Sequence, residues 1–328
     1  MTDSPHFLAI TGPTATGKTA LSLEVAARLD GEIISMDSRQ VYRGMDIGTD
    51  KVSLRERARV PHHGLDTLDP DEFYSAGQFG RDARAWIREI RARGRVPLLA
   101  GGTGFFLRSL THPLFPEPEL DRDRLLALRS YLAGLPWMKL QEWVRVLDPD
   151  RSDAAIEGGT QRVTRALEVA LLSGQPLSRW HDATRGSEEA PVPGVIVALE
   201  LPREELHRRI DTRVDSMADA GFSEEVARLM EAGYGPEAPG MTGTGYREMS
   251  AYLRGDLELE AALKEMKQST RQFARRQETW FRHQLPSALR LDALSPLEEQ
   301  VVRVVTAWHE ATGTPVIDEE ATEGTAEE

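Results

Sequence analysis

The residues from Gly12 to Thr19 are the part of the sequence whose types and spacing point most directly to chemistry. They read Gly-Pro-Thr-Ala-Thr-Gly-Lys-Thr and fit the phosphate-loop pattern G-x-x-x-x-G-K-[ST]. Glycines let backbone N–H groups face phosphate oxygens, and the helix that follows adds its positive end. Lys18 would place a cation on the distal phosphate, and the Thr19 hydroxyl would join the coordination shell of Mg²⁺. A phosphate-bearing ligand of open identity is therefore expected on Gly12, Pro13, Thr14, Ala15, Thr16, Gly17, Lys18 and Thr19.

A single carboxylate, Asp37, follows the second apolar run of the chain, Ile33–Met36. At the end of a strand beside a phosphate loop, such a group can bind Mg²⁺ through water or accept a proton from a nucleophile. The alternative is a purely structural role in an Asx turn or a helix cap. The neighbouring phosphate loop favours the functional interpretation.

Strand-like and helix-like segments alternate around these residues, which predicts how they are positioned. Apolar spacing indicates helices at Thr19–Leu29 and Gln78–Arg93. Short apolar runs predict buried strands at Phe7–Thr11, Glu32–Asp37, Val96–Ala100 and Val195–Leu201. This alternation predicts an α/β fold, a parallel sheet wrapped by helices, with its ligand site at the carboxyl ends of the strands.

The pattern changes at the proline-rich segment Pro113–Pro118, after which only helical periodicity is found as far as Pro193. We expect helices at Leu125–Leu132, Trp137–Val146 and Arg162–Leu172. The simplest organisation is an all-helical insertion, residues 117–194, between two parts of one core, residues 1–116 and 195–311. Long helices are expected in the second part at Arg203–Ala220, Ser223–Ala232 and Leu259–Arg282. Residues 312–328 are acidic and nearly devoid of apolar side chains, so we expect them to be disordered.

Composition narrows the class of protein. The chain has 328 residues, of which 40% are hydrophobic, so a sizeable core can form. It has no cysteine, which excludes disulfides, thiolate metal sites and cysteine nucleophiles. We find neither a secretory signal pattern nor an apolar stretch of roughly 20 residues that would span a membrane. A soluble, cytoplasmic protein is expected.

The net charge of −13 argues on its face against a nucleic-acid partner, but charge is unevenly placed. The segment Lys264–Arg282 carries six basic residues against Glu265 and Glu278. It is either an ordinary solvated helix face or a surface that binds phosphate. Composition leaves both interpretations open.

Two further groups have mainly structural interpretations. His62 and His63 lack a third ligand at metal-binding spacing and are expected to be a pair in a loop. Trp137, Trp143 and Trp180 could stack on bases, but their helical spacing favours packing in the core of the insertion.

Several short motifs occur in a fixed order along the chain. After the phosphate loop come Asp-Ser-Arg-Gln-Val-Tyr, Asp-Ile-Gly-Thr, Gly-Gly-Thr-Gly, Gln-Arg with Arg-Ala-Leu-Glu-Val, and Thr-Arg-Gln-Phe-Ala-Arg-Arg-Gln, at Asp37–Tyr42, Asp46–Thr49, Gly101–Gly104, Gln161–Val169 and Thr270–Gln277. This ordered set resembles the tRNA dimethylallyltransferases, also called tRNA isopentenyltransferases. The similarity extends to about Leu291.

The resemblance implies an activity. Members of the family transfer a dimethylallyl group from dimethylallyl diphosphate to the N6 amine of the adenosine 3′ of the anticodon, tRNA position 37, in tRNAs that read codons beginning with U. Pyrophosphate leaves and Mg²⁺ is required. The resemblance also implies that the helical insertion binds the anticodon stem-loop. A monomer is our default expectation, since the sequence does not determine the oligomeric state. ATP, the ligand that such a loop usually suggests, becomes the less expected one.

Residue roles are implied in the same way. Asp37 would take the proton of the amine, Thr103 would sit at the reaction centre, and Arg213 would act with Lys18 on the leaving pyrophosphate. Thr19 would be the metal ligand. Contacts with tRNA would come from Asp37, Ser38, Arg39, Gln40, Thr103, Arg122 or Arg124, Gln161, Arg162, Val163, Thr164 and Arg165. The segment Glu157–Thr160 departs from the family's usual turn, and Thr160 is expected to cap the next helix.

Two other classes of protein are alternatives to a tRNA dimethylallyltransferase. A small-molecule kinase or nucleoside-triphosphatase would use the same loop, and the spaced arginines of the insertion do not exclude it. An RNA-binding protein with a vestigial loop is the second, but the intact Lys18, Thr19 and Asp37 speak against it.

Overall fold

A computed structural model describes residues 6–112, 118, 120–183 and 190–313. It divides into two compact units, a larger one of Met1–Thr111 with Val192–Glu328 and a smaller one of His112–Pro191. The disorder expected for residues 312–328 concerns a segment that lies, from residue 314 onward, outside the described residues. Among the described helices, none combines the length and the apolar composition needed to span a membrane.

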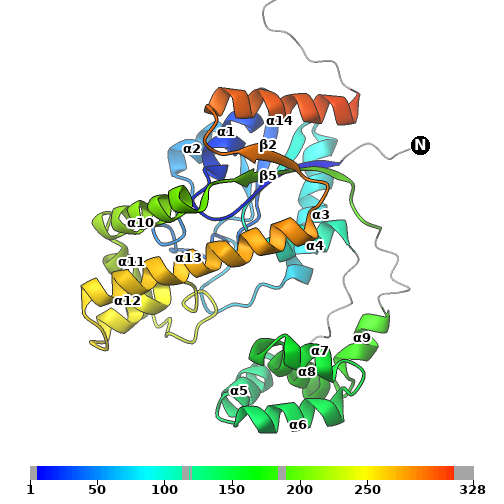
Figure 1. Cartoon of the computed structure of the whole chain (residues 1–328), viewed down its shortest axis with the longest axis vertical. Coiled ribbons are helices and arrows are strands. Elements are labelled where there is room, and N and C mark those ends of the chain that lie inside the picture. Colours follow the sequence, from blue (N-terminus) through cyan, green and yellow to red (C-terminus); the bar gives the residue numbers. More distant parts are fainter. Residues whose placement is uncertain (1–5, 113–117, 119, 184–189, 314–328) are drawn as a thin grey trace, which may run out of the picture. The chain divides into compact units, whose positions relative to one another are not determined.

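The described part of the larger unit contains one parallel sheet (Figure 1). Its strands lie in the order β3-β2-β4-β1-β5-β6, and every neighbouring pair is parallel. The predicted α/β fold with a parallel sheet is confirmed. The strands are β1 (Phe7–Thr11), β2 (Gly31–Ser35), β3 (His62–His63), β4 (Val96–Ala100), β5 (Gly194–Glu200) and β6 (Leu289–Asp292).

The helices of the larger unit include all those predicted there, with ends shifted by at most two residues. The short elements α2, α4, α12, β3 and β6 and the terminal helix α14 were not predicted. The helices are α1 (Lys18–Arg28), α2 (Leu54–Arg59), α3 (Ala76–Ala92), α4 (Gly104–Thr111), α10 (Arg203–Asp219), α11 (Phe222–Glu231), α12 (Tyr246–Leu253), α13 (Leu259–Gln284) and α14 (Leu297–Thr312).

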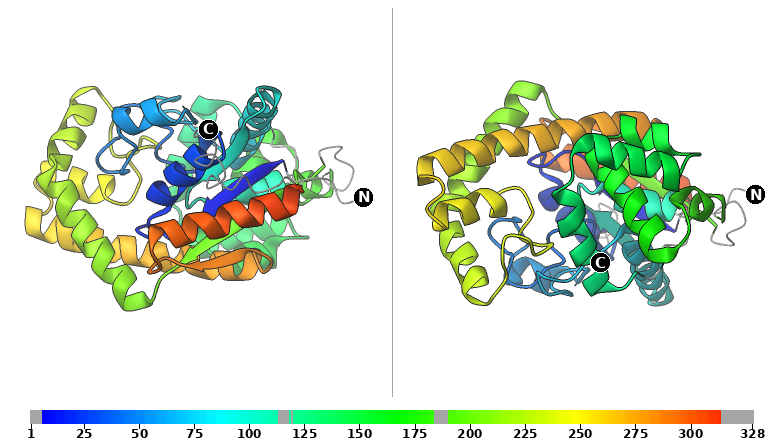
Figure 2. Two further views of the ribbon diagram at one scale, coloured as in Figure 1. Left: turned by 90° about the horizontal axis from the view of Figure 1, so that it is seen from above. Right: turned by 90° about the horizontal axis from the view of Figure 1, so that it is seen from below.

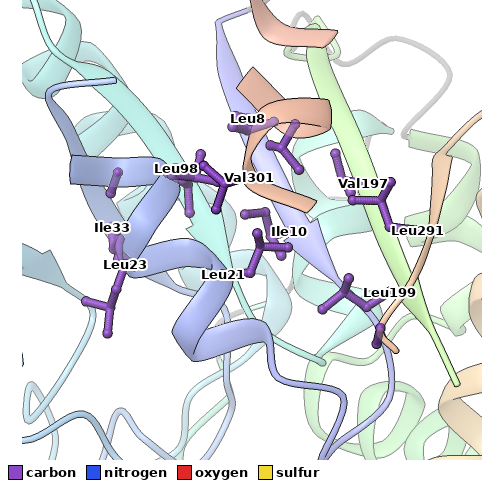
Figure 3. Close-up of a cluster of buried hydrophobic side chains, with 14 of the residues drawn as sticks. Leu8, Ile10, Leu21, Leu23, Ile33, Leu98, Val197, Leu199, Leu291 and Val301 are labelled. Atoms are coloured by element: carbon purple, nitrogen blue, oxygen red, sulfur yellow. The ribbon is translucent and has the colours of Figure 1, made fainter. Parts of the chain in front are cut away.

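Helices cover both faces of the sheet, as a parallel sheet requires. Side chains alternate along β1, so Leu8 and Ile10 join the cluster formed with α1 and α14, as Figure 3 shows. Phe7 and Ala9 point to the other face and pack with α3 and α4. Helices α1 and α14 lie side by side on the first face (Figures 1 and 2). Burial on both faces explains why these strands read as continuous apolar runs.

The register of the strands brings three loops to one edge of the sheet. Ala100 of β4 is level with Ile10 of β1 and with Ser35 of β2. The segments that follow these strands therefore begin at the same level. They are the phosphate loop, the segment with Asp37, and the Gly-Gly-Thr-Gly loop.

A third apolar cluster, formed by α10, α11, α12 and the segment after β2, supports a further loop. The buried carboxylate of Glu225 accepts the backbone N–H groups of Asp46, Ile47 and Gly48 at 2.7–3.1 Å. It also accepts the hydroxyl of Tyr246 at 2.6 Å. Glu225 thus holds the Asp-Ile-Gly-Thr motif, which leads into Thr49 and Asp50.

The smaller unit is helical throughout its described part and has its own core around Leu140, Val163 and Leu167. Trp143 packs against this core, and Trp180 is partly buried. The prediction for Trp137 was wrong, because its side chain is 38% exposed. The helices are α5 (Arg122–Ala133), α6 (Trp137–Leu147), α7 (Ser152–Glu157), α8 (Thr160–Ser173) and α9 (Leu177–Ala183), of which α7 and α9 were not predicted.

Two local expectations need correction. His62 and His63 are not in a loop but form β3, which pairs with Ile33 and Ile34 of β2, while the His63 ring reaches the Glu32 carboxylate at 2.7 Å. Thr160 does not cap α8. Gly159 is the N-cap with a φ of 86° and no side-chain hydrogen bond, so the helix begins with Thr160 itself.

Candidate active site

The phosphate loop lies between β1 and α1, as its spacing predicted. Gly12 has a φ of 141°, and a Cβ there would meet the carbonyl oxygen of Leu199 at 2.7 Å, so only glycine fits. Within the loop, the Thr16 hydroxyl donates to the Pro13 carbonyl at 2.9 Å. The Lys18 ammonium donates to the same carbonyl at 2.6 Å. The loop is therefore closed on itself around the position where phosphate would bind.

Two cations meet at this loop. Arg213 of α10 donates to the Thr14 hydroxyl at 2.9 Å and lies 3.6 Å from Asp50. Burial, and then the charge of Arg213, lower the pKa of Lys18 to about 7, against opposing effects of Asp37 and Asp50. The site thus holds positive charges that repel each other, and an anionic ligand would relieve that repulsion.

Asp37 lies two residues beyond β2 and serves the local backbone as well as the site. Its Oδ1 accepts the N–H groups of Arg39 at 2.8 Å and Gln40 at 3.4 Å, so the Asx turn weighed from the sequence is present. The carboxylate also lines the cavity that contains Lys18. Its Oδ2 has no hydrogen-bond partner among the described residues.

Thr103 connects two of the three loops. Its hydroxyl accepts the N–H of Ser38 at 3.1 Å, and its own N–H donates to Met36 at 3.2 Å. Thr103 is therefore tied to the segment that carries Asp37. The hydroxyl does not itself line the cavity, whereas the neighbouring Gly101 and Gly102 do.

The side chains of Arg39 and Gln40, expected to contact tRNA, are engaged within the protein. Arg39 donates to the carbonyls of Pro239 and Gly240, and burial lowers the pKa of its guanidinium. The Gln40 amide accepts the Ser35 hydroxyl at 2.9 Å and donates to the Thr49 carbonyl at 3.2 Å. Gln40 lines the cavity of the site, whereas Arg39 holds the segment Pro239–Gly240 and is not part of the cavity wall.

A cavity of about 430 Å³ lies at the carboxyl edge of the sheet. It brings together residues of the three loops, of the strands β2, β3 and β4, of the segment Thr49–Val52 and of the helices α1, α10 and α13. Most of the expected phosphate-binding and catalytic residues line it, together with Asp50 and Gln277, to which sequence reasoning assigned no role. The charged and polar residues that matter here are Lys18, Thr19, Asp37, Asp50, Arg213 and Gln277.

Asp50 and Gln277, to which the sequence assigned no role, both lie at the end of a recognisable motif. Asp50 directly follows the Asp-Ile-Gly-Thr motif, and Gln277 ends the motif Thr270–Gln277. Neither residue type at those positions suggests phosphate chemistry by itself.

The basic run of α13 has two different faces. Lys267 and Arg271 pair with Asp215 and Asp211 of α10 at 2.6 and 3.1 Å. Arg275 and Arg276 have no acidic partner within the described part of the chain. They line an open depression of about 650 Å³ with Gln272, Thr279, Trp280, His283 and Gln284. The basic run is thus partly a neutralised packing face and partly a free cationic surface.

The tRNA contacts expected from the smaller unit differ in exposure. Gln161 and Arg162 are exposed, while Arg165 lies 3.4 Å from the buried Glu168. The Val163 side chain is fully buried, so any RNA contact there would use its backbone. Thr164 is half-buried, and the Arg124 N–H caps α5 through Asp121. The side chain of Arg122 lies outside the described part.

Residues 6–112, 118, 120–183 and 190–313 contain no cluster of three or more His, Asp or Glu side chains able to hold a metal ion. A magnesium ion bound by substrate phosphates needs only one or two protein oxygens. Thr19 and Asp37 supply hard oxygen donors to the same cavity. These residues fit such an ion.

The parallel sheet, the phosphate loop with Lys18, and Arg213 beside that loop define a phosphate-loop α/β protein. A family model described as IPP transferase matches residues 40–284. The chain belongs to the IPP transferase family.

Individual relatives agree with this membership. The chain is 43% identical over 306 residues to a tRNA dimethylallyltransferase of Roseiflexus sp. (strain RS-1), covering 93% of this chain and 99% of that one. It resembles the crystal structure of tRNA delta(2)-isopentenylpyrophosphate transferase from Staphylococcus epidermidis, with a TM-score of 0.67, 35% identity and coverage of 93% and 99%. It also resembles a eukaryotic dimethylallyltransferase crystallised while acting on tRNA, with a TM-score of 0.77, 27% identity and coverage of 95% and 81%.

Proposed function

We propose that this protein transfers a dimethylallyl group from dimethylallyl diphosphate to the N6 amine of adenosine 37 in tRNAs that read codons beginning with U. The observation that carries the proposal is the cavity in which Lys18 and Arg213 face the phosphate loop and Asp37 stands within electrostatic reach. A diphosphate leaving group needs the cations, and an amine nucleophile needs the carboxylate. The names of the relatives support a dimethylallyl group as the group transferred and tRNA as its acceptor, and the diphosphate as its carrier is part of the proposal.

The reaction assigns one task to each group. The adenine N6 forms a bond to C1 of the prenyl group while the bond from C1 to the diphosphate oxygen breaks. Asp37 accepts the proton that the amine loses. Lys18 and Arg213 hold the charge that grows on the departing pyrophosphate. Thr103, in the loop after β4, orients the amine through the segment Asp37–Ser38, whose Ser38 N–H its hydroxyl accepts. An allylic centre with cationic character needs surroundings that keep water away from it during the transfer.

Magnesium would be held by the Thr19 hydroxyl, with substrate phosphate oxygens and water completing its shell. When bound, the ion supplies further positive charge against the leaving pyrophosphate.

The acceptor is proposed to be the anticodon stem-loop. Its target base must leave the stack, which costs a few kcal/mol and is cheapest in a single-stranded loop. The exposed Gln161 and Arg162 of α8 and the free arginines of α13 are the proposed phosphate contacts. The protein is proposed to act as a monomer.

One assay separates this function from its rivals. The protein is incubated with unmodified tRNA, Mg²⁺ and either labelled dimethylallyl diphosphate or labelled ATP. We expect label in tRNA from the prenyl donor alone. Phosphate transfer or ATP hydrolysis without prenylation would instead support a kinase or nucleoside-triphosphatase, and RNA binding without either reaction would support a vestigial loop.

A pair of substitutions tests the role of Asp37. Asp37→Asn keeps an oxygen that can accept the Arg39 and Gln40 N–H groups, so the turn survives, but it removes the base. We expect tRNA affinity to be kept and the transfer rate to fall by about 10²–10⁴-fold, as for the loss of a general base. Asp37→Ala should lose the same rate and some stability as well. Full activity of the Asn variant would remove Asp37 from its role.

A further inference from the structure

Gln277 lies at the point where the phosphate loop and the Gly-Gly-Thr-Gly loop approach each other. Its Oε1 accepts the N–H of Thr14 at 2.9 Å. Its Nε2 donates to the carbonyl of Gly102 at 2.8 Å. The side chain comes from α13, is 8% exposed, and lines the cavity of the site. One amide therefore joins two loops that begin at different strands.

Glutamine suits this position because the two loops present opposite groups. Thr14 offers a donor and Gly102 offers an acceptor, so only one orientation of the amide satisfies both. An ionised glutamate would accept from Thr14 but could not donate to Gly102. A methionine of similar length would leave both backbone groups without this partner.

The glycine opposite the amide is part of the same fit. A Cβ at Gly102 would lie 2.4 Å from Nε2 of Gln277 and 3.4 Å from the Gly12 carbonyl. The larger clash is with the end of a side chain, so an alanine at position 102 would displace the amide rather than the loop. The absence of a side chain at Gly102 is what lets Gln277 reach its carbonyl.

We infer that Gln277 is a positioning residue that keeps the phosphate loop in register with the loop carrying Thr103. The inference rests on the proposed function, in which the first loop holds the diphosphate and the second holds the acceptor amine. Bond formation needs the amine and C1 of the donor at near-attack distance, and a 1 Å misplacement costs about 10²-fold in rate. Gln277 touches neither reactant in this account and acts through the two loops.

The test measures prenyl transfer by the full chain with saturating dimethylallyl diphosphate and varied tRNA. For Gln277→Met we expect kcat to fall by about 10–100-fold, with KM for tRNA changed by less than about threefold. Gln268→Met is the matched control, because Gln268 is exposed on the same helix. It should leave both constants within about twofold of the wild type.

A double-mutant cycle with Gly102→Ala separates positioning from general destabilisation. Because the alanine displaces the amide, Gly102→Ala alone should lower kcat nearly as much as Gln277→Ala. The double variant should be no slower than Gln277→Ala, since the displaced group is already gone. The inference would be overturned if the kcat losses of Gly102→Ala and Gln277→Ala multiplied in the double variant. It would also be overturned if kcat per folded molecule were unchanged in Gln277→Met.

The outcome is distinguishable from failure of the proposed function. If the wild type prenylates tRNA while the Gln277 variants keep its kcat, the inference is wrong and the function stands. If the wild type transfers no prenyl group, the function fails. In that case the role of Gln277 is tested by pyrophosphate affinity, measured by calorimetry. The phosphate loop of Gln277→Met has lost its link to the Gly102 loop and should bind pyrophosphate several-fold more weakly than the wild type. Unchanged binding would overturn the inference about Gln277.

Discussion

Lys18 illustrates how the charge of one residue depends on its surroundings. Burial and the nearby Arg213 lower its pKa to about 7, so at pH 8 roughly one-tenth of free molecules carry the ammonium. A bound diphosphate adds negative charge at the loop and favours the protonated form. The ligand therefore raises the pKa of Lys18, and binding at pH 8 must be accompanied by proton uptake.

We predict that calorimetry of pyrophosphate binding at pH 8, repeated in buffers of different ionisation enthalpy, will detect an uptake approaching one proton. Lys18→Arg is the control, because arginine stays charged and has no proton to gain. The difference between the two proteins cancels protons bound by the ligand itself. Equal uptake by both would show that Lys18 is already charged in the free protein.

Glu32 is a second buried charge, and its role is in stability. Its carboxylate, 4% exposed, accepts hydrogen bonds from Arg93 at 2.7 and 3.0 Å and lies 2.7 Å from the His63 ring. Burial by itself would raise the pKa of Glu32, but the bonds from Arg93 and His63 outweigh it and hold the pKa at about 2. This network joins β2 to β3 and to the end of α3.

The sign of the pH dependence follows from that lowered pKa. The folded chain keeps Glu32 ionised where the unfolded chain would protonate it, so the stabilisation is complete above about pH 4.5 and is lost as the pH falls toward 2. We expect Glu32→Gln to lower the free energy of unfolding by roughly 1–3 kcal/mol at pH 7 in urea titrations. The difference from the wild type should shrink at pH 3.

Glu200→Gln is the control for Glu32, because Glu200 is 60% exposed beside Arg290. A surface pair of this kind contributes about 0–1 kcal/mol. A similar loss in both variants would mean that burial of Glu32 adds nothing.

At the scale of the element, α13 divides its basic residues between two tasks. Lys267 and Arg271 are paired with α10, whereas Arg275 and Arg276 are free of acidic partners among the described residues. The carboxylate beside each paired cation cancels most of its attraction for the phosphates of a nucleic acid. Of these four residues, only Arg275 and Arg276 are expected to release counterions from RNA.

We predict that Arg275→Gln with Arg276→Gln weakens tRNA binding by about tenfold at 0.1 M salt and reduces the slope of log K against log salt by about 1–2. Lys267→Gln with Arg271→Gln should change affinity by less than about twofold. Filter-binding titrations over a range of salt concentrations measure both. Equal losses would show that net charge, and not the free face, determines binding.

At the scale of the whole molecule, the two units have separate cores. Every residue of the smaller unit's cluster lies between Leu128 and Leu177, and the sheet is built without it. The two places in the larger unit that flank the smaller unit in the sequence lie next to each other, since the Val192 N–H donates to the Leu110 carbonyl at 2.8 Å. A short linker can therefore close the chain where the smaller unit is removed.

We predict that replacing residues 112–191 by a short Gly-Ser linker leaves a protein that unfolds cooperatively and binds pyrophosphate within about threefold of the full chain, because its core is intact. Its affinity for tRNA should fall by at least about tenfold, because the proposed contacts of α8 are lost. Circular dichroism, calorimetry and gel shifts measure these properties. Unimpaired tRNA binding would remove the smaller unit from recognition.

The sequence by itself determined the features whose physics is local. The phosphate loop is recognisable because it consists of eight consecutive residues, whose backbone would bind the ligand. The strands of a parallel sheet are recognisable as short apolar runs because both faces of the sheet are buried. The helical periodicity of α13 and its run of positive charge could also be predicted, because both depend only on residues close together in the sequence.

Only the tertiary structure decided which distant groups meet. Thr14 is bound by an amide 263 positions away, and its hydroxyl by Arg213, 199 positions away. Spacing along the chain carries no signal for such contacts, because the order of the strands and the packing of α10 and α13 create them. The packing of α13 on α10 also paired Lys267 and Arg271, two of the six cations of the basic run, with acidic residues. The pairing of β3 with β2 placed His62 and His63 at the edge of the sheet.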